Sequence, residues 1–319
     1  MSSSFQLLER VVHVAPFGVR FRDAVTGQQV SDGLSVEAYP LEAALGRTRP
    51  EDEVFGRRRT FANRSGTHVL MGVPGLRNFE LSDPGEGDWD ASPPGTSRFI
   101  FEVEDKKGRY LPFSFEARLP YKGLFVWDEN PLPFESPLAP RPQDGVPLFS
   151  ASSRVPPAGM TAVRAELWDE FAESPAAHAL LEARFKGQLL GRGVADDEGR
   201  IALIFPYPPP ARLPHTSPTD SPPLGSIPPL TQQEWAVDLA ARYSPVSSPP
   251  PYKPRFPDLL TMLSQGPATL WRDAAKTEPL TAATLGYGRE CFVRTEAASP
   301  VTSPLEGAPS AALFVTPVA

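Results

Sequence analysis

Residues 97–119, SRFIFEVEDKKGRYLPFSFEARL, decide the fold. Apolar and polar side chains alternate on both sides of Lys107-Gly108, and the apolar set is Phe99, Phe101 and Val103, then Leu111, Phe113, Phe115, Ala117 and Leu119. A period of two is typical of half-buried strands, and a glycine-containing turn between two such runs joins them. The stretch therefore predicts a β-hairpin.

The same alternation predicts further strands, at residues 10–22, 33–39, 67–73, 160–168, 179–185, 201–205, 285–294 and 311–316. Acidic, glycine-ended turns separate some of them, as at Asp23–Gly27 and Asp196–Gly199. Short strands at regular spacing are typical of a sandwich rather than a parallel sheet. We therefore expect a mainly β protein with two antiparallel β-sandwich-like domains.

Three segments require a choice between helix and strand. Residues 175–186 are rich in helix formers, but they alternate with period two and run into a glycine turn, which favours a strand. Residues 231–234 match a helix-capping box, yet Trp235, Val237, Leu239, Ala241 and Tyr243 follow at period two, so we again expect a strand. Residues 257–265 predict one short helix, with Pro257 at its first position and Gly266 as its cap.

Proline is abundant: the chain has 40 in 319 residues, about one in eight against about one in twenty in average proteins. Internal prolines break helices, so a mostly helical protein is excluded. The prolines gather in residues 129–147 and 205–257. We expect a domain at 1–128, a proline-rich linker at 129–147, and a second domain at 148–319 with proline-rich insertions at about 208–230 and 245–280.

Charge and cysteine content limit the partners and the cell compartments that fit the sequence. The chain carries 31 basic and 38 acidic residues, a net charge of −7, and neither half is basic, which argues against nucleic acid as a partner. Cys291 is the single cysteine, so an intrachain disulfide is excluded and a reducing compartment is favoured. The first ten residues lack the pattern of a signal peptide, and no run is long enough for a membrane span. We expect a cytoplasmic protein.

The motif search points away from an enzyme. The four histidines, His13, His68, His178 and His215, have no second ligand at a metal-binding spacing, and the first three fall within expected strands. Gly191-Arg-Gly193 resembles the start of a dinucleotide fingerprint, but we read it as a bend between strands. We expect no catalytic, cofactor-binding or metal-binding residues.

Two segments are candidate partner contacts. The first is the basic run Arg57, Arg58 and Arg59, which either neutralises the nearby acidic residues 51–53 or meets an acidic partner. The second runs through Pro208, Pro209, Pro210, Arg212 and Pro214. It is either a polyproline II ligand for a recognition domain or a stiff spacer.

Two stretches resemble a known β module. Residues 21–27, FRDAVTG, with Asp32-Gly33-Leu34 after them, look like the opening of a transthyretin-like or carboxypeptidase-regulatory-like sandwich. Residues 183–206, with GVADDEGR at 193–200, resemble the acidic-glycine turn of the same module. The resemblance implies a β-sandwich and no reactive group.

A second resemblance concerns residues 66–75, GTHVLMGVPG, and 105–112, DKKGRYLP. They are similar to proteins encoded with bacterial contractile injection systems, the phage-tail-like particles. This resemblance implies a structural or adaptor component that is assembled in the cytoplasm from several protein subunits. We therefore expect a non-enzymatic part of such a particle, which contacts other subunits, or further copies of itself, through β domains and proline-rich arms.

Two other classes stay open. One is a glycan- or peptide-binding sandwich that uses exposed aromatic side chains such as Trp89, Trp127 or Trp168. The other is an accessory domain of an enzyme complex. Binding by the isolated protein would favour the first, and a catalytic partner encoded nearby would favour the second.

Overall fold

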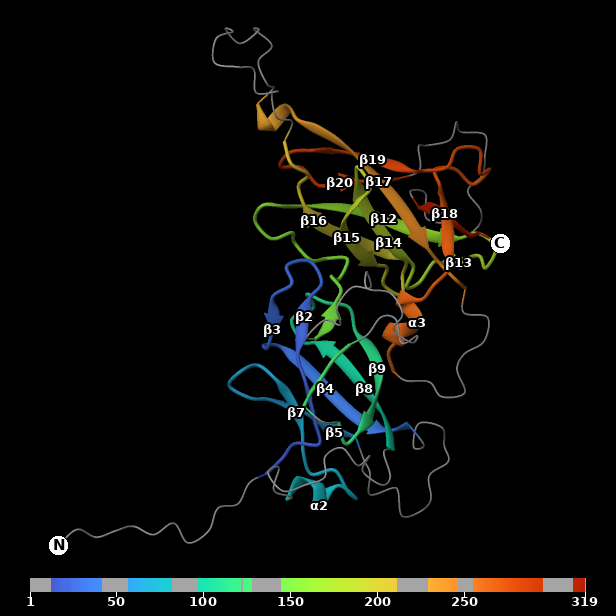
Figure 1. Cartoon of the computed structure of the whole chain (residues 1–319). Coiled ribbons are helices and arrows are strands. Elements are labelled where there is room, and N and C mark those ends of the chain that lie inside the picture. The colour runs from blue at the N-terminus through green and yellow to red at the C-terminus, as the bar shows by residue number, and fades with distance from the viewer. Residues whose placement is uncertain are drawn as a thin grey trace, which may run out of the picture.

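The computed structural model describes residues 13–41, 57–81, 97–121, 123–127, 145–210, 229–245, 255–294 and 312–318. These residues are mainly β and build two bodies, one drawn in blue to teal at the bottom of Figure 1 and one drawn in green to red above it. The expected fold class is confirmed.

The N-terminal body has two facing layers. One layer contains two small sheets with the orders β10-β1-β7-β6 and β11-β2-β3, and the other contains a sheet with the order β5-β4-β8-β9. The strands of the first layer are β1 (Phe17–Val19), β2 (Phe21–Asp23), β3 (Gln29–Val30), β6 (Phe61–Ala62), β7 (His68–Leu70), β10 (Leu124–Phe125) and β11 (Val146–Leu148). Those of the second are β4 (Leu34–Pro40), β5 (Arg58–Arg59), β8 (Ser97–Asp105) and β9 (Phe113–Leu119). A short helix, α2 (Arg77–Glu80), lies below them in Figure 1.

The expected hairpin is the centre of this body. Strands β8 and β9 pair antiparallel with Phe101 opposite Phe115, and the turn contains Gly108 at φ 67°. The Phe101 ring stacks on Phe17 of the facing layer with centroids 4.3 Å apart, and on Phe115 at 5.1 Å. The apolar face predicted from the alternation is therefore the face that is buried between the layers.

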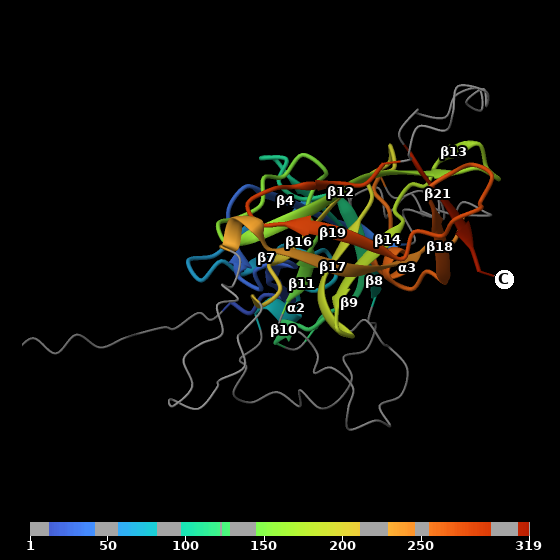
Figure 2. The ribbon, with the colours of Figure 1, turned by 90° about the horizontal axis from the view of Figure 1, so that it is seen from above.

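The second body is one large curled sheet, seen from above in Figure 2. Its main path is β13-β12-β21-β18-β17-β14-β15, while β16 and β20 pair with β12, and β19 pairs with β17. The strands are β12 (Met160–Asp169), β13 (Ser174–Pro175), β14 (Leu180–Phe185), β15 (Gln188–Val194), β16 (Arg200–Pro206), β17 (Glu234–Arg242), β18 (Pro267–Trp271), β19 (Ala282–Gly286), β20 (Cys291–Phe292) and β21 (Leu313–Pro317). A 3-10 turn, η2 (Leu230–Gln232), precedes β17.

The choices between helix and strand are confirmed, with different ends. Residues 179–185 form β14, and the run from Trp235 forms β17, whose side chains are alternately buried and exposed. The expected helix is α3 (Leu259–Leu263), but it is shorter than expected: Pro257 precedes it, and Ser264 rather than Gly266 is its C-cap. At the other end, Asp258 is the N-cap and accepts a hydrogen bond from the Thr261 amide at 2.9 Å. None of the helices in the described ranges is long and apolar enough to cross a membrane.

Four local expectations are wrong. His13 precedes β1, which begins at Phe17. Residues 285–294 are not one strand, because Gly288 at φ 73° turns the chain between β19 and β20. His178 lies in a turn at φ 62°, just before β14. Gly191 and Gly193 lie within β15 and do not bend the chain between strands.

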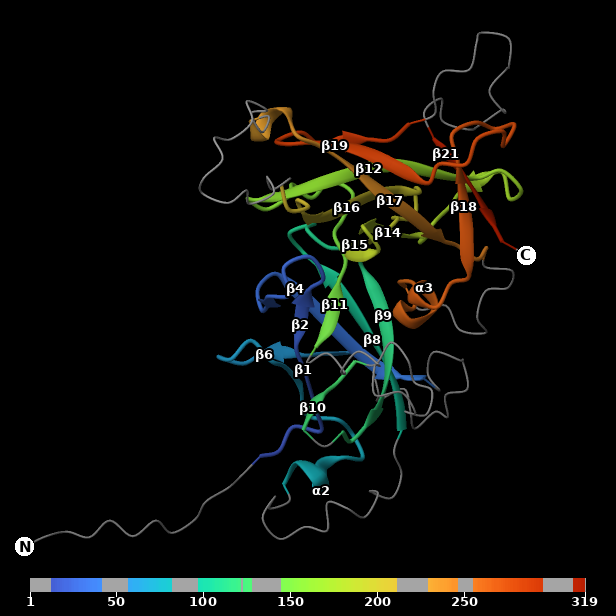
Figure 3. The ribbon, with the colours of Figure 1, turned by 45° about the horizontal axis from the view of Figure 1, so that its top comes forward.

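The chain passes between the two bodies more than once, as the tilted view in Figure 3 shows. Residues 146–148, which span the end of the expected linker and the first residue of the expected second domain, form β11 and pair in parallel with β2 of the N-terminal body. Linker residues 129–144 lie outside the described residues. Residues 255–263 return to the same body, where Leu259 and Met262 of α3 join its core. Leu180 and Val194 of the second body border that core as well.

Candidate functional site: interaction surfaces

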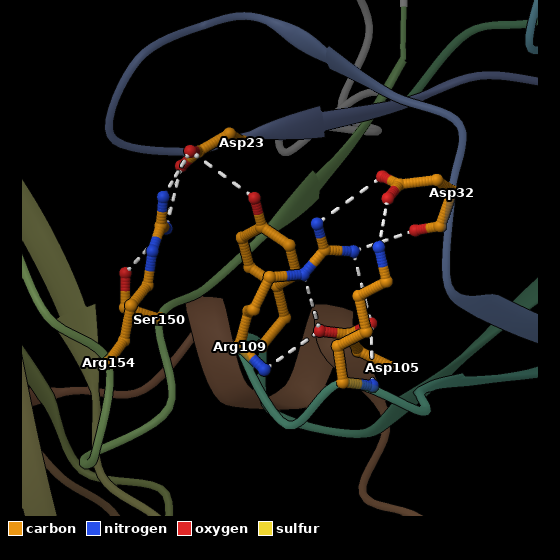
Figure 4. A network of polar contacts seen from close by, with 8 residues as sticks. Asp23, Asp32, Asp105, Arg109, Ser150 and Arg154 are labelled. Carbon is orange, nitrogen blue, oxygen red and sulfur yellow. Dashed lines mark hydrogen bonds and ion pairs between the residues drawn. The ribbon is translucent and has the colours of Figure 1, made fainter. Parts of the chain in front are cut away.

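A buried polar network lies where the two bodies meet (Figure 4). Arg154, in the segment that leads from β11 into β12, donates to both carboxylate oxygens of Asp23 on β2, at 3.1 and 2.5 Å. Both side chains are nearly buried, with exposed fractions of 12% and 5%. Tyr110 donates its hydroxyl to the same carboxylate at 3.3 Å, and the Arg154 guanidinium lies 4.8 Å from the centre of the Tyr110 ring.

Neighbouring groups keep the Asp23 side chain ionised. Burial raises the pKa of this carboxyl, but the hydrogen bonds from Arg154 and from the Val25 amide lower it by more, so the pKa lies below the ordinary value of 3.8. Burial and the nearby carboxylate raise the pKa of Tyr110. Asp23 and Arg154 therefore stay ionised, and their pairing ties β2 to the segment that enters the second body.

The network continues at the turn between β8 and β9. Arg109 donates to Asp105, whose side chain is fully buried, at 3.0 Å, and to the backbone carbonyl of Asp32 at 2.7 Å. Lys107 also pairs with the Asp32 carboxylate. Each of these carboxylates pairs with a cation of the same chain, and we call this network the brace below.

A second contact between distant segments involves Ser114 of β9. Its amide donates to the Pro257 carbonyl at 2.7 Å, and its hydroxyl donates to the Phe256 carbonyl at 3.1 Å. At the far end of α3, the Gln265 side chain donates to the His178 carbonyl at 2.6 Å and accepts from the Ser244 amide at 3.0 Å. Residues 255–265 thus form a clasp between the bodies, and we use that name below.

The three arginines expected as partner contacts have different environments. Arg57 donates to Glu102 at 2.5 Å, pairs with Glu37 at 3.5 Å and covers the Tyr39 ring at 4.8 Å. Arg58 and Arg59 form β5 on the edge of the sheet and are exposed. The acidic residues 51–53, named as one possible neutralising partner, lie outside the described residues. Among the described residues, Glu37 and Glu102 pair with Arg57.

The prolines expected as contacts begin at an aromatic cluster. Tyr207 lies 5.7 Å from Trp235 and 5.0 Å from Tyr287 between ring centres. Pro208 is buried, whereas Pro209 and Pro210 are exposed, and the Trp235 ring nitrogen donates to the Pro209 carbonyl at 3.3 Å. Arg212 and Pro214 lie outside the described residues. The start of the segment is therefore fixed to the sheet, and Pro208 faces its own chain.

A groove of about 600 Å³ is lined by residues of the second body and of the segment that leads into it. Its lining contains Ser152, Ser153, Arg164, Ala165, Glu166, Arg200, Ile201, Phe292, Val293 and Arg294. Arg164 pairs with Glu290, and Arg200 pairs with Asp196 and Glu198. Arg294 instead lies over the Phe292 ring at 5.6 Å, and Phe292 is 56% exposed. The lining is therefore mixed: Ile201 and Val293 are buried, Phe292 is exposed, and the charged side chains are three arginines and Glu166.

Two of the three tryptophans named for glycan or peptide binding are buried. Trp127 is buried at 7% and Trp168 at 8%, both within apolar clusters, while Trp89 lies outside the described residues. Within the described ranges, histidine, cysteine and acidic side chains form no group of three suited to a metal ion. Burial raises the pKa of the half-buried Cys291 thiol.

Pattern reading did not find the brace or the clasp. In the sequence, Asp23 is the start of an expected turn and Glu102 is a polar position of an alternating strand, and neither pattern specifies a distant partner. One signal was present in the sequence: acidic residues occupy positions that continue buried strands, where an unpaired charge is costly. Comparison of the chain with protein-family models, with curated proteins and with solved structures finds no match.

Proposed function

We propose that the chain is a non-enzymatic structural or adaptor component of a phage-tail-like contractile particle. The observation that carries the proposal is the way the two β bodies are joined. Asp23–Arg154, β11 and the clasp connect them at separate points, and the cores touch at Leu180 and Val194. A brace of this kind suits a part that holds a fixed geometry between neighbouring subunits.

The proline-rich segment supplies the second line of support. Its two ends, at residues 210 and 229, are attached to ordered structure, since Trp235 binds Pro209 and η2 begins at Leu230. Proline-rich chain has little conformational freedom to lose on ordering, so contacts made through it cost less entropy. In the proposed assembly, residues 211–228 contact neighbouring subunits.

The test is incorporation into particles in the cells that naturally produce the protein. Three tagged versions are compared: the full chain, a variant without residues 211–228, and a variant in which a glycine/serine segment of equal length replaces them. The full chain is expected to sediment with contractile particles that are visible by electron microscopy. Both variants are expected to keep the circular dichroism spectrum of the full chain and to remain in the unassembled fraction.

Two results would overturn the proposal. One is a full chain that sediments only as a free protein while particles form normally. The other is normal incorporation of the variant that lacks residues 211–228.

A further inference from the structure

The most exposed large apolar side chain in the described residues is Phe171, at 94%. It lies at the tip between β12 and β13, in the sequence Asp169-Glu-Phe-Ala-Glu173. A single exposed apolar residue is ordinary on a protein surface. Phe171 is unusual because the loop beneath it is held firmly.

Asp169 holds the tip. Its side chain is buried, and one carboxylate oxygen accepts hydrogen bonds from the Phe171 amide at 2.9 Å and the Ala172 amide at 3.1 Å. The other oxygen accepts from the Tyr243 hydroxyl at 2.9 Å. Because the backbone under Phe171 is already ordered, the loop loses little conformational entropy when a partner binds the ring. Rigid aromatic side chains are frequent anchors of interfaces.

The groove described above has complementary chemistry. The tip has an aromatic ring between two acidic residues, Glu170 and Glu173, and Glu170 is already paired with Lys276 at 2.9 Å. The groove has an exposed aromatic ring, Phe292, beside Arg294, and its other charged lining residues are Arg164, Arg200 and Glu166. Arg294 lies over the Phe292 ring, and its guanidinium is the group of the groove that would meet an acidic residue of a partner, such as Glu173.

We propose that the Phe171 tip of one copy of this chain docks into the groove around Phe292 and Arg294 of a second copy. The tip and the groove are different surfaces, and in Figure 1 β13 lies toward the right of the second body and β20 toward the left. A contact between two different surfaces is head-to-tail, so it leaves a free tip and a free groove at the ends. It therefore grows into open chains or closed rings.

This inference goes beyond the proposed function, because it names a contact between copies that requires no other subunit. It is tested on the purified full chain by sedimentation velocity, at concentrations from about 5 to about 500 µM, the range in which small interfaces form. The weight-average sedimentation coefficient is expected to rise with concentration. The rise is expected to be smaller in 0.5 M salt, where charge pairs are screened over about 4–5 Å.

Two variants remove one surface each. Phe171→Asp alters the tip, and Arg294→Glu reverses the charge on the groove. Each alone is expected to sediment as a monomer at all concentrations. Their mixture is expected to form a one-to-one dimer that does not grow, because the intact tip of Arg294→Glu fits the intact groove of Phe171→Asp. Phe61→Ser is the matched control, since Phe61 is 52% exposed on β6 of the other body.

The proposal is overturned if the unaltered chain stays monomeric across the concentration range. It is also overturned if the chain associates but Phe171→Asp and Arg294→Glu associate equally well, or if their mixture does not form the dimer. Thermal unfolding of each variant shows whether it keeps the native fold. Each of these three outcomes would overturn the contact between copies only. The proposed function is tested separately, by incorporation into particles.

Discussion

Asp23 and Arg154 form an ion pair that is almost removed from water, so each charge depends on the other. Replacement of one member of a buried pair leaves the second uncompensated, which costs about 3–5 kcal/mol. We expect Asp23→Asn to lower the free energy of unfolding by this amount in urea denaturation at pH 7. The matched control is Asp32→Asn, because the Asp32 side chain is 60% exposed and such pairs contribute about 0–1 kcal/mol.

The same residue sets an acid dependence. The pKa of Asp23 is lower in the folded chain than its ordinary value of 3.8, so the unfolded chain binds the proton first as the pH falls. The stabilisation is complete above about pH 4–5, where Asp is ionised even in the unfolded chain, and is lost as the pH falls toward the lower, folded pKa. The free energy of unfolding of the unaltered chain should therefore fall more steeply below pH 4 than that of Asp23→Asn. Equal slopes would contradict this assignment.

Strand β15 approaches β16 closely enough to require glycine. A Cβ atom on Gly191 would lie 2.9 Å from the Phe205 Cβ and 3.0 Å from the Ile204 carbonyl oxygen. Those atoms belong to a packed strand and cannot move aside cheaply, so we expect Gly191→Ala to cost about 1–3 kcal/mol of stability. Thermal or urea unfolding measures the loss.

Gly286 at the end of β19 is the matched control for that substitution. A Cβ there meets only the Arg289 side chain, at 3.8 Å, and the backbone is not in the left-handed region. Gly286→Ala should leave the stability within about 0.5 kcal/mol of the unaltered chain. If both substitutions cost the same, the close approach of β15 to β16 does not explain the glycine.

The strands that the sequence predicts best are those whose partner is next in the chain. The hairpin at β8 and β9 could be read from alternation and one turn, because both strands and the turn lie within residues 97–119. The pairing of β2 with β11 could not, since more than a hundred residues separate Phe21 from Val146 and no local pattern specifies a distant partner. Alternation also failed to show that both faces of β8 are covered, with Ile100 packed on Tyr39 and Leu41.

The candidate surfaces were less predictable than the fold for the same reason. The basic run and the prolines stood out by composition, but the contacts that fix their roles come from Glu102 and Trp235, far away in the sequence. The groove is assembled from four separated segments, at 152–153, 164–166, 200–201 and 292–294. A single sequence without its fold does not bring those segments together.

At the scale of the whole molecule, the N-terminal core is completed by residues of the C-terminal half. Leu259 of α3 is fully buried in that core. Removal of a buried leucine side chain costs about 2–5 kcal/mol, so Leu259→Ala should lower the free energy of unfolding by that amount. Because the clasp joins the bodies, calorimetry should show the loss of stability in the unfolding of the N-terminal body, although the substitution lies beyond residue 255.

Leu81→Ala provides the comparison for that prediction. Leu81 is 49% exposed in the N-terminal body, and its truncation should change stability by no more than about 0.5 kcal/mol. An effect of Leu259→Ala as small as that of Leu81→Ala would mean that the clasp does not contribute to the core.

The repeated passage of the chain between the bodies has a mechanical consequence. The described N-terminal residues lie in the lower body and the C-terminal ones in the upper body (Figure 1). A pull on the two ends is shared by the β2–β11 hydrogen bonds, the Asp23–Arg154 pair and the packing of α3. These connections carry the load side by side, so separating the bodies requires them to give way together. We therefore expect a force applied to one body to be passed to the other with little relative movement of the two bodies.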